Sequence, residues 1–116
     1  MKRSIRLTRS TDFQRVRRFG RSCAHPLLVL VVLPNQGSVS RFGVAAGRTI
    51  GNAVRRNRAK RRLREALRLN QNNISPGWDI LLIARRPIAQ ASFQQLQDAL
   101  VALLQRAKLW RDNDDR

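Results

Sequence analysis

The most chemically distinctive part of this sequence runs from Arg55 to Arg64, where seven of ten residues are basic. The only acid between Arg48 and Arg68 is Glu65. Like charges three and four positions apart on a helix repel one another by roughly 0.2–0.5 kcal/mol per pair. A row of phosphates would relieve that repulsion, because guanidinium groups bind phosphate oxygens in pairs. The segment therefore predicts binding of a polyanion.

The composition of the whole chain agrees with this prediction. Twenty-four Lys and Arg residues against seven Asp and Glu give a formal net charge of +17. Arginine dominates, since the only lysines are Lys2, Lys60 and Lys108. The guanidinium group suits contacts with phosphates and stacking on bases, which favours a nucleic acid over a lipid surface as partner. A hydrophobic fraction of 42% indicates a folded protein rather than a basic tail.

Residues that could cleave a phosphodiester are scattered. Asp12, Glu65 and Asp79 belong to separate predicted elements, His25 stands beside a proline, and Cys23 has no base partner in the sequence. A nuclease site needs clustered carboxylates for metal ions, or a histidine as general acid or base. We therefore expect no catalytic residue and no metal ion or other cofactor bound by the protein alone.

The compartment follows from two features of the chain. A single cysteine cannot form an internal disulfide, which favours a reducing compartment, and we expect the cytoplasm. The basic start lacks the apolar stretch of a signal peptide, and the apolar run Leu27–Leu33 is too short to cross a bilayer. We expect no membrane partner.

The elements that position the basic segment can be predicted from hydrophobic patterns. A first helix should span Ser10–Phe19, with Ser10 or Thr11 as N-cap and Gly20 as its stop. Strands should span Leu27–Leu33 and Phe42–Ala46, and their short connection suggests an antiparallel pair.

The second half should contain helix, strand and helix. The predicted ranges are Asn52 to about Leu69, Trp78–Ala84, and Ser92 to about Lys108, the last opening with a Ser92-x-x-Gln95 capping box. Together the elements predict one α+β sandwich domain over residues 1–116, ordered from about 6 to 111.

A helical wheel of Asn52–Leu69 separates two sides. The buried side should hold Ala59, Leu63, Ala66 and Leu67, and the opposite side Asn57, Lys60, Arg61, Arg64 and Arg68. Asn57 can donate to and accept from a base edge or a ribose hydroxyl, which a charge cannot do. Gly51 suits a turn with positive φ and would let backbone N–H groups approach a phosphate.

The stretch Gly51-Asn-Ala-Val-Arg-Arg-Asn-Arg-Ala-Lys-Arg-Arg-Leu-Arg64 resembles the RNR signature of the bacterial ribonuclease P protein family. The resemblance extends over about residues 6–111. It includes Arg6-Leu7, Asp12-Phe13-Gln14, Val16, Gly20, Phe42-Gly43-Val44 and Ile83-Ala84-Arg85-Arg86-Pro87.

This resemblance implies an αβββαβα sandwich with a left-handed βαβ crossover, although right-handed crossovers are the general rule. It implies that the RNA-binding residues are Arg48, Gly51, Asn52, Arg55, Arg56, Asn57, Arg58, Lys60, Arg61, Arg64 and Arg68. A cleft for the 5′ leader of precursor tRNA would include Phe13 and positions 17 and 31. Arg17 and Val31 depart from the aromatic residues often found there, and Thr49 replaces a second base beside Arg48.

The implied function is that of a protein subunit of ribonuclease P, which removes the 5′ leader in tRNA maturation. Its partners would be one catalytic RNA per protein and precursor tRNA, with Mg²⁺ required by the holoenzyme. The nearest alternative is a ribosomal or other structural RNA-binding protein. A DNA regulator placing residues 52–69 in the major groove lacks zipper heptads, and an autonomous nuclease lacks a site.

Overall fold

The computed structural model describes residues 5–112 of the chain. Its helices are α1 (Ser10–Phe19), α2 (Ala53–Asn70) and α3 (Phe93–Arg106), and its strands are β1 (Arg21–Ala24), β2 (Leu28–Pro34), β3 (Arg41–Ala45) and β4 (Trp78–Ala84). Short 3₁₀ turns are η2 (Arg48–Ile50), η3 (Gln71–Asn73) and η4 (Arg86–Gln90). The αβββαβα order is confirmed. The expectation of fraying beyond residues 6–111 falls mainly outside the described residues.

The four strands form one mixed sheet in the order β1-β2-β4-β3. β2 runs antiparallel to β1 and β4, whereas β3 runs parallel to β4. The predicted antiparallel pairing of the second and third strands is therefore wrong, because β4 lies between them. The reason is burial: Ile80, Leu81 and Leu82 are all fully buried, so β4 needs a neighbour on each side and cover on both faces.

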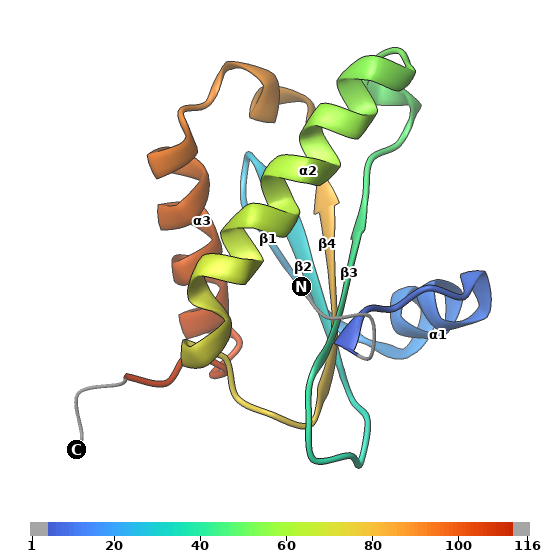
Figure 1. Ribbon diagram of the computed structural model, residues 1–116, viewed down its shortest axis with the longest axis vertical. Helices are drawn as coiled ribbons and strands as arrows, with labels where there is room; N and C mark the ends of the chain where they lie inside the picture. The colour runs from blue at the N-terminus through green and yellow to red at the C-terminus, as the bar shows by residue number, and fades with distance from the viewer. Residues whose placement is uncertain (1–4, 113–116) are drawn as a thin grey trace.

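Helix α2 makes the crossover between the parallel strands β3 and β4. In Figure 1 both strands run upward, β3 lies to the right of β4, and α2 descends in front of them, so the crossover is left-handed. The family resemblance implied this hand. The general preference for right-handed crossovers would have given the opposite one.

Helices cover the two faces of the sheet unequally. Helices α2 and α3 lie on one face and α1 alone lies on the other (Figure 1). The larger core cluster joins the sheet to α2 and α3 through side chains such as Leu30, Leu63 and Leu100. The smaller cluster, beneath α1, contains Leu7, Val16, Val31 and Leu81. The face that carries α1 is consequently only partly covered.

The helix ends show how local sequence acts. Asn52 caps α2 by accepting a hydrogen bond from the Arg55 amide, and Ser92 and Gln95 form the expected capping box of α3. Helix α1 has the predicted bounds, but its N-cap is Arg9, which makes no side-chain capping bond, so the expected cap at Ser10 or Thr11 is wrong. Among residues 5–112, none of the helices combines the length and apolarity that a bilayer crossing requires.

Candidate nucleic-acid interface

The start of α2 is built to present backbone and arginine together. Gly51 adopts φ 131°, a conformation that disfavours other residues, and a Cβ there would lie 2.8 Å from Arg55 Cδ. Asn52 then turns the chain into the helix through its side-chain oxygen, 3.0 Å from the Arg55 amide nitrogen. The turn predicted at Gly51 is confirmed. It leaves Arg48, in η2, and Asn52 both exposed beside the positive end of the helix.

One side of α2 is fixed in the core. Ala59, Leu63, Ala66 and Leu67 are buried against the sheet and α3, as the helical wheel predicted. Burial of this side fixes the rotation of the helix about its axis. The basic side chains therefore lie on surfaces set by packing, and the structure divides them between two flanks rather than along one side.

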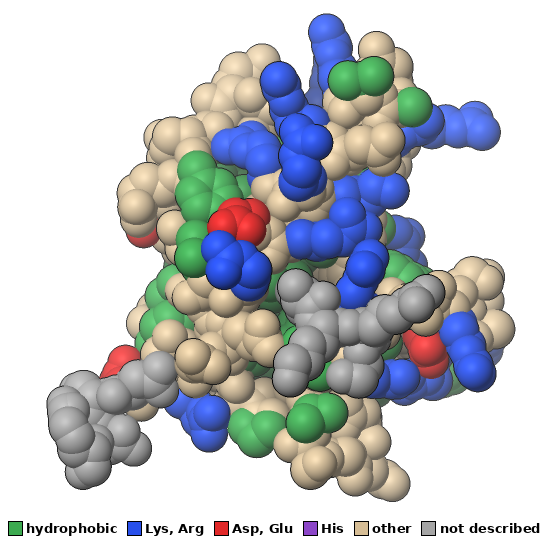
Figure 2. All heavy atoms as spheres, viewed as in Figure 1, with side chains coloured by type: hydrophobic (Ala, Val, Ile, Leu, Met, Phe, Trp, Pro, Cys, Tyr) green, Lys and Arg blue, Asp and Glu red, His purple; other side chains and the backbone are tan. Residues whose placement is uncertain are grey.

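The first flank faces the N-terminal segment and α1, and is called the α1-side flank. It forms a hollow lined by Arg6, Arg61, Arg64, Glu65 and Arg68. Lys and Arg side chains gather over α2 in the view of Figure 2. Glu65 is the single acid in this hollow, and it is paired with Arg68 at 2.5 Å between Oε2 and the guanidinium. Arg61 and Arg64 face solvent without a described acid as ion-pair partner.

Electrostatics in this hollow favour an anion. Partial burial, together with the nearby charge of Arg6, lowers the pKa of the Arg64 guanidinium below its ordinary value. A lowered arginine pKa means that the charged form is less favourable here than in water. A phosphate bound between Arg6 and Arg64 would reverse that effect. Arg6 was absent from the predicted site because it lies far from α2 in the sequence.

The second flank faces η4 and is called the η4-side flank. It carries Arg55, Arg58 and Arg62. Arg62 is committed to the fold, since its guanidinium donates to the carbonyl oxygens of Ile88 at 2.7 Å and Ala91 at 2.5 Å. Arg55 and Arg58 are exposed. Their side chains donate no hydrogen bond to any described residue, so they are available to a ligand.

The remaining predicted residues of α2 lie between these flanks or at their edges. Asn57 is exposed, whereas Arg56 and Lys60 are half-buried. Arg56 and Lys60 lie within one helical turn of buried residues of α2, and this limits their exposure. All the predicted RNA-contacting residues lie on α2 or in the turn before it, but Arg56, three positions before Ala59 and seven before Leu63, lies toward the buried side of the helix.

The three residues predicted for the leader cleft lie in different environments. Phe13 is half-buried and its ring packs on Gly43, where a Cβ would lie 2.9 Å from Phe13 Cζ. Arg17 is exposed. Val31 is 4% exposed and lies under the end of α1, where a Cβ on Gly20 would come within 2.7 Å of Val31 Cγ1. Val31 therefore supports this surface from beneath.

Other apolar side chains on the same face are more accessible. Val29, Ala45 and Ile83 are half-buried, adjacent in the sheet register and packed beside the α1 cluster. They form an apolar floor next to α1. Sequence reasoning missed Val29 and Ile83 because β2 and β4 are apolar at nearly every position, so alternation does not reveal which side chains face the open side.

An ionic cluster holds α1 on the sheet. Asp79 is 0% exposed, and its carboxylate accepts hydrogen bonds from Arg41 at 2.8 and 2.9 Å, Asn35 at 3.0 Å and Arg15 at 2.5 Å. Burial alone would raise the pKa of Asp79, but the bonds from Arg41, Asn35 and Arg15 outweigh it and lower the pKa. Arg15 belongs to α1, so this carboxylate joins three segments of the chain.

The cluster also bears on catalysis. Asp12 and Asp79, separate in the sequence, share Arg15 and Arg41 as partners. Guanidinium groups thus occupy the surroundings in which a divalent cation would need free carboxylate oxygens. Within residues 5–112 no three or more histidine, cysteine, aspartate or glutamate side chains are grouped as a metal site would require.

The sequence is similar to known proteins over nearly its whole length. A family model described as Ribonuclease P matches residues 1–108. The ribonuclease P protein component of Herpetosiphon aurantiacus is 46% identical over 114 residues, covering 98% of this chain and 93% of that protein. That of Roseiflexus castenholzii is 47% identical over 108 residues, covering 92% and 88%.

Solved structures agree in fold. The RNase P protein of Staphylococcus aureus superposes with a TM-score of 0.82 at 32% identity, covering 92% of this chain and 98% of that one. The RNase P protein of Thermotoga maritima gives a TM-score of 0.79 at 32% identity, with 87% and 96% covered.

Proposed function

This chain is a member of the bacterial ribonuclease P protein family, and on that premise we propose that α2 binds the ribonuclease P RNA while the sheet face beside α1 holds the 5′ leader of precursor tRNA. As a protein component of ribonuclease P it is a subunit of a tRNA-processing ribonucleoprotein endonuclease, whose catalytic subunit is the RNA. Family membership decides against a ribosomal protein.

The observation that carries the RNA-binding part is the unpaired charge around α2. Arg55, Arg58, Arg61 and Arg64 are exposed and have no described acidic partner, although each lies on a helix whose other side is fully packed. Such a surface is stabilised by phosphates, and release of counterions drives its association with RNA.

The leader-binding part rests on the open face beside α1. Its apolar floor of Val29, Ala45 and Ile83 suits the faces of unpaired bases, and the exposed Arg17 can reach their phosphates. Phe13 is the one aromatic residue among those predicted for the leader cleft. Its ring packs on Gly43 beside this floor. Binding there would favour leader-bearing precursor over mature product.

The remaining features of the proposed assembly follow from charge and composition. We propose one protein per RNA, working in the cytoplasm, with Mg²⁺ bound by the holoenzyme and no cofactor bound by the protein alone. A net charge of +17 repels divalent cations, so these ions would associate with the RNA. The single Cys23, half-buried, fits a reducing compartment.

Reconstitution tests the proposed function. The protein is added to ribonuclease P RNA at low magnesium, and we expect restored cleavage of precursor tRNA, because the protein reduces phosphate repulsion between the two RNAs. The reconstituted complex should also bind precursor tRNA more tightly than mature tRNA. Equal affinities for the two tRNAs would remove leader binding from the function while leaving binding to the RNA subunit intact.

A further inference from the structure

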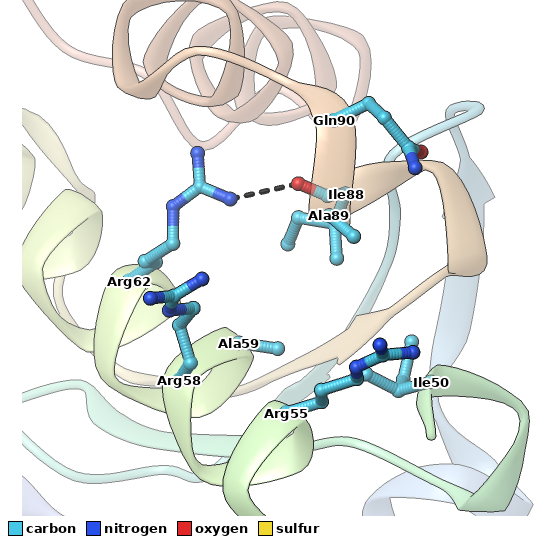
Figure 3. A pocket seen from close by; sticks show the side chains of 8 residues that line it. All are labelled: Ile50, Arg55, Arg58, Ala59, Arg62, Ile88, Ala89 and Gln90. Atoms are coloured by element: carbon cyan, nitrogen blue, oxygen red, sulfur yellow. Dashed lines mark hydrogen bonds between the residues drawn. The ribbon is translucent and has the colours of Figure 1, made fainter. Parts of the chain in front are cut away.

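A pocket of about 250 Å³ lies between α2 and η4 (Figure 3), and is called the η4 pocket. Its floor is apolar and consists of the buried side chains of Ile50, Ala59 and Ile88. Arg55 and Arg58 extend from α2 at its side, and Ala89 and Gln90 lie at its rim. The pocket thus has an apolar floor and a cationic wall.

The cationic wall has two free members. Arg62 donates to the carbonyl oxygen of Ile88 (Figure 3) and also to that of Ala91, and these bonds hold η4 against α2 as one side of the pocket. The side chains of Arg55 and Arg58 donate to no acceptor among the described residues. Arg62 therefore shapes the pocket, while Arg55 and Arg58 are free to bind what enters it.

The combination selects the kind of ligand. A bare phosphate would gain nothing from an apolar floor, and a purely apolar ligand would leave two guanidinium charges uncompensated. A nucleotide has both a base with apolar faces and a phosphate. Unpaired bases of RNA are commonly splayed out and placed on apolar, aromatic or guanidinium surfaces. The volume is below the roughly 300–1,000 Å³ of pockets for drug-sized ligands, so it suits a single base whose ribose and phosphate lie outside the pocket.

The hollow described above on the α1-side flank is lined differently. It is lined entirely by the charged residues Arg6, Arg61, Arg64, Glu65 and Arg68. A surface of that kind suits a phosphate backbone, where no base needs to be desolvated. This hollow and the η4 pocket therefore differ in the chemistry that they can bind.

We infer that the η4 pocket holds one unpaired nucleotide of the ribonuclease P RNA. Its base lies on Ile50, Ala59 and Ile88, and its phosphate lies between Arg55 and Arg58. This inference rests on the proposed function and adds to it a specific contact with an RNA base, beyond attraction between charges.

A variant that fills the pocket without changing charge tests the inference. Ala89 is exposed at the rim, so Ala89→Trp should occupy the space of the base and leave the core intact. Its matched control is Ala102→Trp, at an exposed alanine of α3. We expect the Kd for ribonuclease P RNA to rise about tenfold in the first variant and to stay unchanged in the second. Ala89→Leu serves if the tryptophan variant fails to fold.

Chemical probing of the RNA gives the second measurement. Acylation of ribose 2′-hydroxyls should show one or two unpaired nucleotides that are protected in the wild-type and Ala102→Trp complexes and reactive in the Ala89→Trp complex. Salt dependence of the Kd should be the same for all three proteins, because no cation is removed.

Two outcomes overturn the inference alone. The first is a wild-type Kd and footprint for Ala89→Trp while the wild-type protein binds the RNA. The second is tight, saturable binding of 5′-AMP to the isolated protein that Ala89→Trp abolishes. Such binding would assign the pocket to a free nucleotide. We expect that 5′-AMP does not saturate the wild-type protein. Absence of RNA binding by the wild-type protein would instead overturn the proposed function as well.

Discussion

At the scale of single residues, arginine serves at least three purposes in this protein. Arg15 and Arg41 neutralise the buried Asp79, and Arg62 satisfies the backbone carbonyls of Ile88 and Ala91 in and just after η4. Arg61 and Arg64 have no described acidic partner. The same side chain is thus structural where acceptors surround it and ligand-binding where they are missing, a distinction that residue type alone does not carry.

Replacing Arg61 and Arg64 together by alanine should weaken assembly with the RNA subunit and leave the fold unchanged. Both side chains are exposed on the α1-side flank, so their loss removes phosphate contacts without opening a cavity. The Kd for the RNA, measured by filter binding, should rise and its salt slope should decrease by about two. The control is Arg106→Ala with Arg111→Ala, which removes the same charge beyond α2. Equal Kd values for both double variants would exclude a specific role of the flank.

Leu63→Ala should act through packing alone. Leu63 is fully buried between α2, the sheet and α3, so truncation should lower the free energy of unfolding by about 2–5 kcal/mol. Denaturant titration measures this loss. Leu69→Ala on the same helix is the matched control, since Leu69 is 48% exposed and should change stability by less than about 1 kcal/mol. Similar losses in the two variants would contradict the assigned rotation of α2.

At the scale of elements, α1 is held differently from the other helices. It contributes few buried side chains, with Val16 its only fully covered one, and it relies on the Asp79 cluster for its position. Hydrogen bonds and charges are directional, so they fix the placement of α1 beside the apolar floor. The surface proposed for the leader therefore depends on a carboxylate that is fully buried.

Asp79→Asn should loosen α1 more than the rest of the fold. The neutral amide is a weaker acceptor and leaves Arg15 and Arg41 less compensated, which should cost about 1–3 kcal/mol in the free energy of unfolding. Hydrogen exchange should accelerate first at the α1 amides. The control is Asp98→Asn, at an exposed aspartate of α3, with an effect within about 0.5 kcal/mol. Uniform acceleration across all helices would contradict the local role.

Acid should destabilise the protein through the same residue. The pKa of Asp79 is lower in the folded protein than the value of about 3.9 in an unfolded chain, because of its bonds to Arg41, Asn35 and Arg15. Its contribution to stability is therefore full above pH about 4 and is lost as pH falls through the lower folded pKa. Unfolding free energies from pH 6 to pH 2 should fall more steeply for the wild type than for Asp79→Asn. Parallel curves would remove Asp79 from the acid response.

At the scale of the molecule, charge and topology act together. The left-handed crossover places α2 on the sheet face opposite α1, so the two surfaces proposed for RNA and for the leader belong to different faces of one sheet. On this proposal the protein would contact two RNAs at once. Its net charge of +17 would then reduce the repulsion between them.

Salt should weaken the complex strongly. If the protein neutralises about six to ten phosphates, its affinity for the RNA subunit should fall by roughly 10³–10⁵ between 50 and 200 mM monovalent salt. Fluorescence titration at several salt concentrations gives the slope. An affinity that hardly changes with salt would be incompatible with binding through the free arginines of α2.

Much of the site could be predicted from the sequence alone. The cap at Asn52, the turn at Gly51 and the division of α2 into buried and basic sides follow from residues within one helix, where spacing along the chain sets spacing in space. The short strand β1 was predicted only through family resemblance, because its four residues have no apolar pattern.

The sequence by itself determined the nature of this protein: its charge, the order of most elements, and a signature that places it in its family. Tertiary structure decided which cations are free, which apolar side chains remain open, and where β4 lies in the sheet. The reason is physical, since Arg6, Arg62 and Val29 acquire their environments from segments distant in the chain. Local pattern carries no record of such neighbours, so only the folded chain distinguishes an arginine that binds the fold from one that is free to bind RNA.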